Sequence, residues 1–179
     1  MVPINHENTM KRPFLPQEHP MLRQHAAAVT EFDTPELHEL VQDMFDTQYA
    51  GNGVGLAAPQ IGVPLRVIVF AYGGGERDPG APAIPPTVLI NPKIRPDAER
   101  VEEDWEGCFS VPGQRGRVPR WQAIRYRAQD IQGRLVEGRA EGFHARIIQH
   151  EVDHLNGTLF IDHLPPGAGD TSPAAPPTE

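Results

Sequence analysis

The sequence lacks most of what disulfide-rich, secreted or membrane proteins need. It contains one cysteine, Cys108, among 179 residues, so no disulfide can form within the chain and a reducing compartment suits it. No apolar run approaches the ~20 residues of a membrane-spanning helix. Residues 1–20 form a proline-rich lead-in without an apolar core, and they carry acidic residues with few arginines. We therefore expect neither a secretory signal nor a transit peptide, and we expect a cytoplasmic protein.

Positive charge is also scarce. The formal net charge is −8, with 16 Lys and Arg against 24 Asp and Glu. The basic residues form no run and are not interleaved with aromatic residues, which argues against nucleic acid binding by the chain itself. The length suits one domain with its own core. We expect that domain to span residues 1–164, followed by a disordered proline-rich tail over residues 165–179.

The most informative stretch is Gln149–Gly157, with the sequence QHEVDHLNG. His150 and His154 are four residues apart, so on an α-helix they lie on one face and both imidazoles can reach one metal ion. Glu151 is rotated by about 100° from His150, which is where a base acting on water at the metal must be. The helix is supported by an apolar stripe at helical spacing, made of Phe143, Ile147, Ile148, Val152 and Leu155.

This motif also occurs by chance, so the metal site requires a third ligand elsewhere in the chain. Cys108 lies in the stretch Trp105–Gly113, between Gly107 and a Pro-Gly turn, where a cysteine of the apolar core is not expected. One thiolate and two imidazoles leave a coordination position open, which is typical of a catalytic rather than a structural site. His144 falls on another face of the helix and His163 lies beyond its end, so neither is expected to be a ligand.

The rest of the pattern predicts a mixture of helix and strands. A first helix is expected over Thr34–Ala50, with Thr34 as its N-cap and Pro35 at its first position. The other expected elements are a buried strand at Leu65–Phe70, a surface excursion over residues 73–86, a short strand at Thr87–Ile90 closed by Asn91–Pro92, and a hairpin of Trp121–Asp130 with Arg134–Ala140.

A glycine-rich stretch, Gly51–Gly62, follows the first helix. It leads into a strand rather than out of one, which is the reverse of a dinucleotide-binding fingerprint. It also lacks the Gly-Lys-Ser/Thr of a phosphate-binding loop. Two interpretations remain open: a plain turn, or small residues from Gly53 to Ala58 that let an extended peptide substrate approach closely.

Three blocks in order resemble the peptide deformylase family, and the likeness runs from about Pro20 to Leu164. They are GVGLAAPQ at Gly53–Gln60, EGCFS at Glu106–Ser110 and QHEVDHL at Gln149–Leu155. The resemblance implies an α+β fold in which antiparallel strands surround a central helix carrying the two histidines. It also implies removal of the N-formyl group from the initiator methionine of new polypeptides in a bacterial cytoplasm. The implied partners are N-formyl-methionyl nascent peptides and, transiently, the ribosome.

The resemblance also assigns the metal and the residues that bind it. Cys108, His150 and His154 would hold ferrous iron, Fe2+, and Zn2+, Ni2+ or Co2+ could take its place. Glu151 would accept a proton from the attacking water and then pass it to the leaving amine. The chemistry worked out from the residues above agrees with these roles.

Further residues are assigned to the substrate by the same resemblance. The side-chain amide of Gln60 and the backbone N–H of Phe109 would stabilise the oxyanion. Gly55 would meet the substrate backbone, and Val54 and Phe143 would help to line the methionine pocket.

Two charged pairs carry alternative interpretations. Arg115 and Glu106 match family positions at the edge of the site, or they form a structural ion pair. Asp153 and Arg120 are expected to pair and to orient a ligand, whereas Asp153 alone could simply stabilise the helix.

The chain departs from the family pattern at several points. Phe109 stands where leucine is common in bacterial members, and His144 and Arg146 replace apolar residues of the helix. The proline-rich tail takes the place of a C-terminal helix that contacts the ribosome in many bacterial members, so the mode of docking is open.

Two other functions remain as alternatives. A zinc endopeptidase of the thermolysin or metzincin kind shares the helix motif, but it draws its third ligand from a downstream Glu or His and would leave Cys108 unused. A non-enzymatic, metal-bound interaction module would leave Glu151 as a solvated surface charge.

Overall fold

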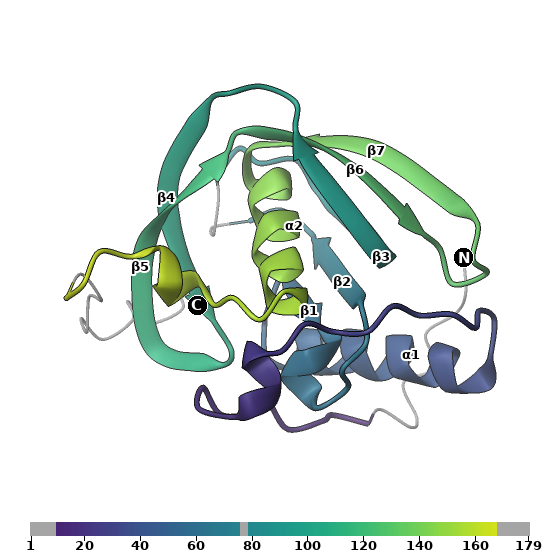
Figure 1. Cartoon of the computed structure of the whole chain (residues 1–179). Helices are drawn as coiled ribbons and strands as arrows, with labels where there is room; N and C mark the ends of the chain where they lie inside the picture. The colour runs from purple at the N-terminus through teal and green to yellow at the C-terminus, as the bar shows by residue number, and fades with distance from the viewer. Residues whose placement is uncertain (1–9, 76–78, 168–179) are drawn as a thin grey trace.

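One helix, α2 (Gly142–Leu155), stands in the middle of the molecule with strands on two sides of it (Figure 1). The computed structural model describes residues 10–75 and 79–167. The other elements, in chain order, are η2 (Pro20–Arg23), α1 (Pro35–Ala50), β1 (Gly55–Ala57), η3 (Ala58–Ile61), β2 (Val67–Tyr72), β3 (Ile84–Pro96), β4 (Val101–Cys108), β5 (Val111–Trp121), β6 (Ala123–Gln129), β7 (Leu135–Glu141) and η4 (Phe160–His163).

The strands of the described residues form two antiparallel sheets. The larger sheet has the order β1-β2-β3-β6-β7, and β4 pairs only with β5 in a separate two-stranded sheet. In Figure 1 the two-stranded sheet stands on one side of α2, and the larger sheet wraps around the other side. The predicted α+β fold, with the H-E-x-x-H motif on a central helix, is confirmed.

Helix α1 forms where the sequence predicts it. The side chain of Thr34 accepts a hydrogen bond from the backbone N–H of Leu37 at 3.2 Å, and Pro35 occupies the first helical position. These features satisfy a free N–H group and preset the backbone at the start of the helix. The helix gives way to a turn at Gly51. Its core-facing side chains include Leu37, Leu40, Val41 and Met44.

Strand β2 separates two halves of the core. Because alternate side chains of a strand point to opposite faces, Ile68 and Phe70 pack in the cluster around α2, whereas Val67 and Val69 pack in the cluster around α1. All four side chains are fully buried. Burial on both faces explains the continuous apolar run. The strand begins two residues later than the predicted Leu65–Phe70.

The prediction for β3 is wrong in its length. The strand begins at Ile84, so the surface excursion is shorter than expected, and it continues for 13 residues to Pro96. Asn91 and Pro92 do not close it. Asn91 adopts a φ of 52°, and the pairing with β6 shifts register between Ile90 and Lys93. An extra residue in one strand of a pair is a β-bulge, which bends a strand without ending it.

The side chain of Asn91 compensates for this irregularity. Its amide accepts a hydrogen bond from the backbone N–H of Val29 and donates one to the carbonyl oxygen of the same residue, both at 2.9 Å. It also donates to the side chain of Gln129 at 2.8 Å. An asparagine tolerates positive φ better than most residues do, and here it fastens the bulge to the neighbouring chain.

The β4–β5 hairpin is not predicted from the sequence. Its strands carry many charges and expose large apolar residues such as Trp105, which is 47% exposed, so they lack a clean alternation of polar and apolar residues. The β6–β7 hairpin is confirmed, although Trp121 belongs to the end of β5.

No helix in residues 10–75 and 79–167 is both long and apolar enough to cross a membrane. Most of the tail predicted for residues 165–179 lies outside the described residues, which end at Gly167.

Candidate active site

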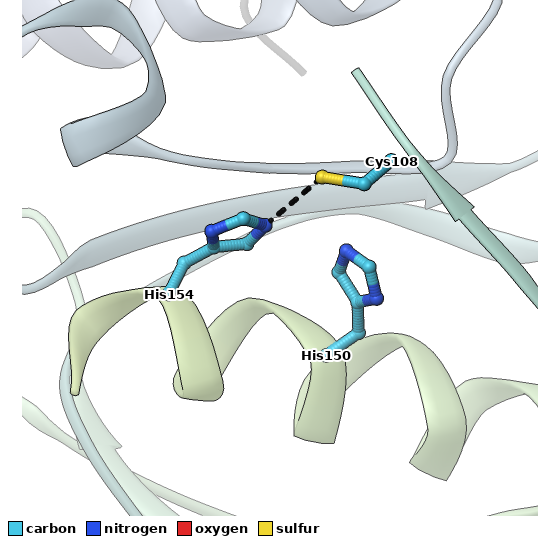
Figure 2. A group of neighbouring side chains, drawn as sticks. All are labelled: Cys108, His150 and His154. Atoms are coloured by element: carbon cyan, nitrogen blue, oxygen red, sulfur yellow. Dashed lines mark hydrogen bonds between the residues drawn. The ribbon is translucent and has the colours of Figure 1, made fainter. Parts of the chain in front are cut away.

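The three predicted metal ligands come together from two separate elements (Figure 2). Cys108 is the last residue of β4, and His150 and His154 lie one turn apart on α2. Their candidate ligand atoms all lie within 4.8 Å of one another. The sulfur of Cys108 is 3.2 Å from Nε2 of His154. This spacing lets one ion contact all three side chains.

The electrostatics of the cluster favour a thiolate. Burial of Cys108 opposes ionisation of its thiol, but His154 and His150 more than offset this effect and hold the pKa of the thiol well below its usual value. The thiolate, not the thiol, is the form of cysteine that binds metals. A thiolate and two imidazoles with an open fourth position suit a divalent ion at a catalytic site, so the residues present fit the metal that the motif implies.

Glu106 orients the first of the two histidines. Its Oε1 lies 2.8 Å from Nδ1 of His150, which leaves Nε2 of that ring for a metal ion. Burial raises the pKa of Glu106, but hydrogen bonds from Arg120 and His150 outweigh burial, so the pKa lies well below its ordinary value. The side chain is a buried carboxylate, not a residue at the edge of the site.

Two buried arginines neutralise that carboxylate. Arg120 donates to both oxygens of Glu106 at 2.9 Å, and Arg146 donates to Oε2 at 2.7 Å. Arg146 also donates to the carbonyl oxygens of Val118 and Glu102, both at 2.8 Å. The sequence marks Arg146 only as a departure from the family, and the signal for its role is a charged residue within an apolar helix face.

The predicted pair of Asp153 and Arg120 is confirmed. Oδ2 of Asp153 lies 2.6 Å from Nη1 of Arg120 and 2.8 Å from Nε2 of His163. The structure does not pair Arg115 with Glu106. Arg115 lies over the ring of Trp105 instead, 5.9 Å from its centroid. A chain of hydrogen-bonded polar groups therefore runs from Glu106 through Arg120 and Asp153 to the partly exposed His163.

Glu151 lies next to the ligand cluster, on the side of β1. It is 4% exposed, and its Oε2 has no hydrogen-bond partner within the described chain. Burial raises the pKa of Glu151 to about 7, against the opposing effect of the two imidazoles. A carboxyl group with such a pKa can both accept and release a proton near neutral pH.

Gln60 is held with its amide nitrogen towards the ligand cluster. Its Oε1 accepts from the backbone N–H of Ala57 at 2.9 Å. Its Nε2 lies 3.5 Å from the sulfur of Cys108 and donates to the hydroxyl of Ser110 at 3.2 Å. Phe109 lies between these last two residues in the chain. Ser110 is almost fully buried, and the sequence assigned it no role.

The predicted pocket residues flank the core around α2. Val54 and Phe143 are half-buried and pack against that cluster, and the ring of Phe143 meets Tyr72 edge-on at 5.1 Å. A polar cavity of about 310 Å³ lies beside Phe143 and Arg146, and none of the three ligands lines it. His144 faces Phe70 at 5.5 Å, so it stays apart from the ligands as predicted.

Together with the α+β fold, this geometry is that of a metal-dependent hydrolase with the H-E-x-x-H motif. A family model described as polypeptide deformylase matches residues 11–168. The chain therefore belongs to the peptide deformylase family, as its three sequence blocks indicate. Members remove the N-formyl group from nascent polypeptides and depend on a metal ion, so the chain is a metal-dependent amide hydrolase of that kind.

Individual relatives support this assignment over most of the chain. Peptide deformylase 2 of Ralstonia nicotianae is 52% identical over 151 residues, which cover 84% of this chain and 85% of the relative. Peptide deformylase 1 of Bordetella pertussis is 53% identical over 141 residues, covering 79% and 80%. The relationship to these enzymes decides against the endopeptidase and the non-enzymatic alternatives.

Solved structures of deformylases match as well. The class I type b peptide deformylase of Acinetobacter baumannii, with Met-Ala-Ser bound, has a TM-score of 0.85 and 38% identity, covering 88% of this chain and all of that chain. The deformylase of Thermotoga maritima has a TM-score of 0.75 and 38% identity, covering 90% and all of that chain.

Proposed function

We propose that Cys108, His150 and His154 bind one Fe2+ ion, and that Glu151, Gln60 and Phe109 carry out the deformylation of N-formyl-methionyl peptides. The observation that carries this proposal is the convergence of three ligand atoms within 4.8 Å beside a buried carboxylate. Zn2+, Ni2+ or Co2+ can use the same sulfur and nitrogen donors. When bound, the ion supplies Lewis acidity: it lowers the pKa of water and polarises the formyl carbonyl group.

Glu151 moves the proton. Its pKa of about 7 lets the carboxylate take a proton from the attacking water and then deliver it to the amine that leaves. Its position next to His150 on the helix, with one oxygen unpaired within the described chain, is consistent with a base that does not bind the metal. Glu106 keeps His150 oriented during these steps.

Gln60 and the backbone N–H of Phe109 stabilise the negative charge that develops on the formyl oxygen. Such donors act best when they are held in place before the reaction begins. The bond from Ala57 fixes the amide of Gln60, and the amide nitrogen lies near Cys108. Phe109 directly follows Cys108, so its backbone is tied to the same ligand.

The substrate lies along β1 in this proposal. β1 is an edge strand that pairs with β2 on one side, and an edge strand can bind an extended peptide through its backbone. Gly55 lies on this strand and offers its backbone. The Acinetobacter relative binds Met-Ala-Ser, and a peptide of this type would place its methionine near Val54 and Phe143.

We also assign the catalytic domain to residues 1–164 and the tail to residues 165–179. Support for the boundary comes from Leu159, Phe160 and Leu164, which pack with β5 in the last apolar cluster of the described chain. Newly made polypeptides are the substrates of the family. We therefore infer that the enzyme acts in a bacterial cytoplasm and contacts the ribosome transiently.

A pair of assays tests the activity. The protein is purified without oxygen, and formyl-Met-Ala-Ser and casein are offered separately. We expect release of formate from the tripeptide, no digestion of casein, and about one iron per chain. Digestion of casein without formate release would refute the proposal.

The ligand assignment needs its own variant. Cys108→Ala should remove a charged ligand and sharply lower the iron content of the purified protein. The Glu99→Gln variant, which alters an exposed residue of the turn before β4, is the matched control and should keep its iron. A Cys108→Ala protein with full metal and full deformylation would rule out the ligand set.

A further inference from the structure

The N-terminal segment Arg12–Leu15 contacts both of the residues that carry the groups assigned to the oxyanion, Gln60 and Phe109. We propose that Phe14 is a positioning residue for this reaction: its ring holds Phe109, and the next residue holds Gln60. The inference rests on the roles proposed above for Gln60 and Phe109. It adds a function for a segment that the sequence treats only as a lead-in to the domain.

Two contacts connect the segment to the residues that carry the donors, one through the ring of Phe109 and one through the backbone carbonyl of Gln60. The rings of Phe14 and Phe109 are stacked, with centroids 4.5 Å apart and an interplanar angle of 11°. The backbone N–H of Leu15 donates to the carbonyl oxygen of Gln60 at 2.8 Å. One short stretch of chain therefore touches residues on η3 and on the β4–β5 turn, which are far apart in the sequence.

The ring of Phe109 is also confined by the turn between α1 and β1. A Cβ atom at Gly53 would stand 2.1 Å from Cζ of Phe109, and one at Gly51 would stand 2.7 Å from Cε1. Neither glycine has a positive φ, so backbone conformation does not require them. The absent side chains make room for the ring, so both positions require glycine for space.

The segment itself is fixed to α1. Nε of Arg12 donates to Oδ2 of Asp43 at 2.7 Å, and the backbone N–H of Arg12 donates to the hydroxyl of Thr47 at 3.0 Å. Asp43 and Thr47 are both buried. Phe14 is thus placed by bonds on one side of it and by the Leu15–Gln60 bond on the other.

The chemical consequence follows from the precision that oxyanion donors need. Small displacements of a donor lower its effect on the transition state more than its effect on the bound substrate. Stacked aromatic rings restrain each other, and the ring of Phe109 is attached to the backbone whose N–H acts. Removing the ring of Phe14 should therefore reduce turnover rather than substrate binding.

The test compares two variants that each remove one ring of a stacked pair. Phe14→Ala should lower kcat about tenfold, leave KM within about twofold of the original enzyme, and leave the metal content unchanged. Tyr49→Ala removes a ring from the Phe45–Tyr49 pair of α1, whose centroids are 6.1 Å apart, and should keep full kcat. Phe14→Tyr keeps the stacking ring and should retain the kcat of the original enzyme.

A milder variant and a variant on the other side of the ring complete the test. Phe14→Leu keeps apolar volume, so it will fold even where Phe14→Ala does not, and it should lose about threefold in kcat. Gly53→Ala should displace the ring of Phe109 from the opposite side and lower kcat. Unchanged kcat in Phe14→Leu and in Gly53→Ala would overturn the inference.

Gln60→Leu separates this inference from the function on which it rests. If Gln60→Leu retains full turnover, the assignment of the oxyanion donors is wrong. If Gln60→Leu loses turnover while the Phe14 variants behave like Tyr49→Ala, the donors are correct and only the positioning role is wrong.

Discussion

A methyl group on the α-carbon of Gly55 would stand 2.7 Å from Oε1 of Glu151. The backbone of Gly55 has no positive φ, so the position requires glycine for space and not for conformation. Because β1 carries no side chain at Gly55, the side chain of Glu151 can occupy the space beside the strand. In the proposed mechanism, Gly55 would therefore make room for the proton-transfer group as well as contact the substrate.

Gly55→Ala should therefore damage catalysis while leaving the metal ligands in place. The added methyl group pushes the carboxylate of Glu151 aside, and a misplacement of about 1 Å can lower kcat/KM on the order of 10²-fold. The control is Gly73→Ala, where the new Cβ meets no atom within 4 Å. Steady-state kinetics with a formyl-Met peptide, beside metal analysis, decide the matter. Equal kcat/KM in both variants would contradict the close contact.

Glu151→Gln should separate proton transfer from metal binding. The amide keeps the size of the side chain but cannot act as the base, and positioned proton transfer contributes roughly 10²- to 10⁴-fold. We expect turnover to fall by about that factor while metal stays near one ion per chain. His154→Ala should instead lose metal and activity together. Near-normal turnover of Glu151→Gln would show that another group moves the proton.

Arg146→Met should destabilise the fold. The change leaves the buried carboxylate of Glu106 with only one of its two guanidinium partners, and loss of one member of a buried ion pair costs about 3–5 kcal/mol. Because Arg120 remains, we expect a loss at the lower end of that range, about 3 kcal/mol, in the free energy of unfolding by urea.

The matched control for Arg146 is an exposed arginine in an ion pair. Arg127 lies 3.3 Å from Glu137, and both side chains are more than 60% exposed. Arg127→Met should change the free energy of unfolding by about 1 kcal/mol or less. If the two variants have the same free energy of unfolding, the buried network does not stabilise the fold in the way that its geometry indicates.

Asp97 should make the stability of the larger sheet depend on pH. It accepts hydrogen bonds from Arg139 on β7 at 2.5 Å and from Arg125 on β6 at 2.6 Å, and these bonds lower the pKa of its carboxyl group. The unfolded chain binds a proton at Asp97 more readily than the folded protein does. The contribution is therefore fully present above the unfolded pKa of about 4 and is lost as pH falls through the lower, folded value.

Urea unfolding at several pH values tests this dependence. Asp97→Asn should be less stable than the original protein at pH 7, and the difference should shrink below about pH 4. Glu99→Gln removes a charge from the same exposed turn and should show no such dependence. A difference that is constant from pH 7 to pH 3 would exclude the ionic bridge.

The clustering of the three candidate ligands could be predicted because its signals are local. His150 and His154 owe their common face to helical periodicity alone, and Cys108 is the only cysteine in the chain. The helix α1 was predictable for the same reason, since Thr34 and Pro35 act within one turn. The roles expected for residues such as Gln60 and Phe109 came only from the family resemblance, because their positions in the sequence show no pattern of their own.

The supporting network could not be predicted because its members are distant in sequence. Nothing in the sequence around Glu106 indicates that Arg146 will meet it 40 residues later, since the pairing depends on β4 lying beside α2. The β4–β5 hairpin was missed because the exposed Trp105 and the surrounding charges hide the alternation of a strand. The length of β3 was predicted wrongly because asparagine is common in turns. Here Asn91 instead forms a β-bulge within the strand, and its side-chain hydrogen bonds hold that bulge in place.

Cys108 belongs to a sheet that shares no strand with the rest of the fold. Besides its ionic contacts and hydrogen bonds to α2, the hairpin packs in a small apolar cluster that includes Val111, Val118 and Phe160. An ion held jointly by Cys108 and α2, as we propose, would be a cross-link between this separately paired hairpin and the central helix. The free energy with which it binds adds to the work of separating the hairpin from the helix. In the proposed site, the ion that serves the chemistry would therefore also make separation of the hairpin from the helix less frequent.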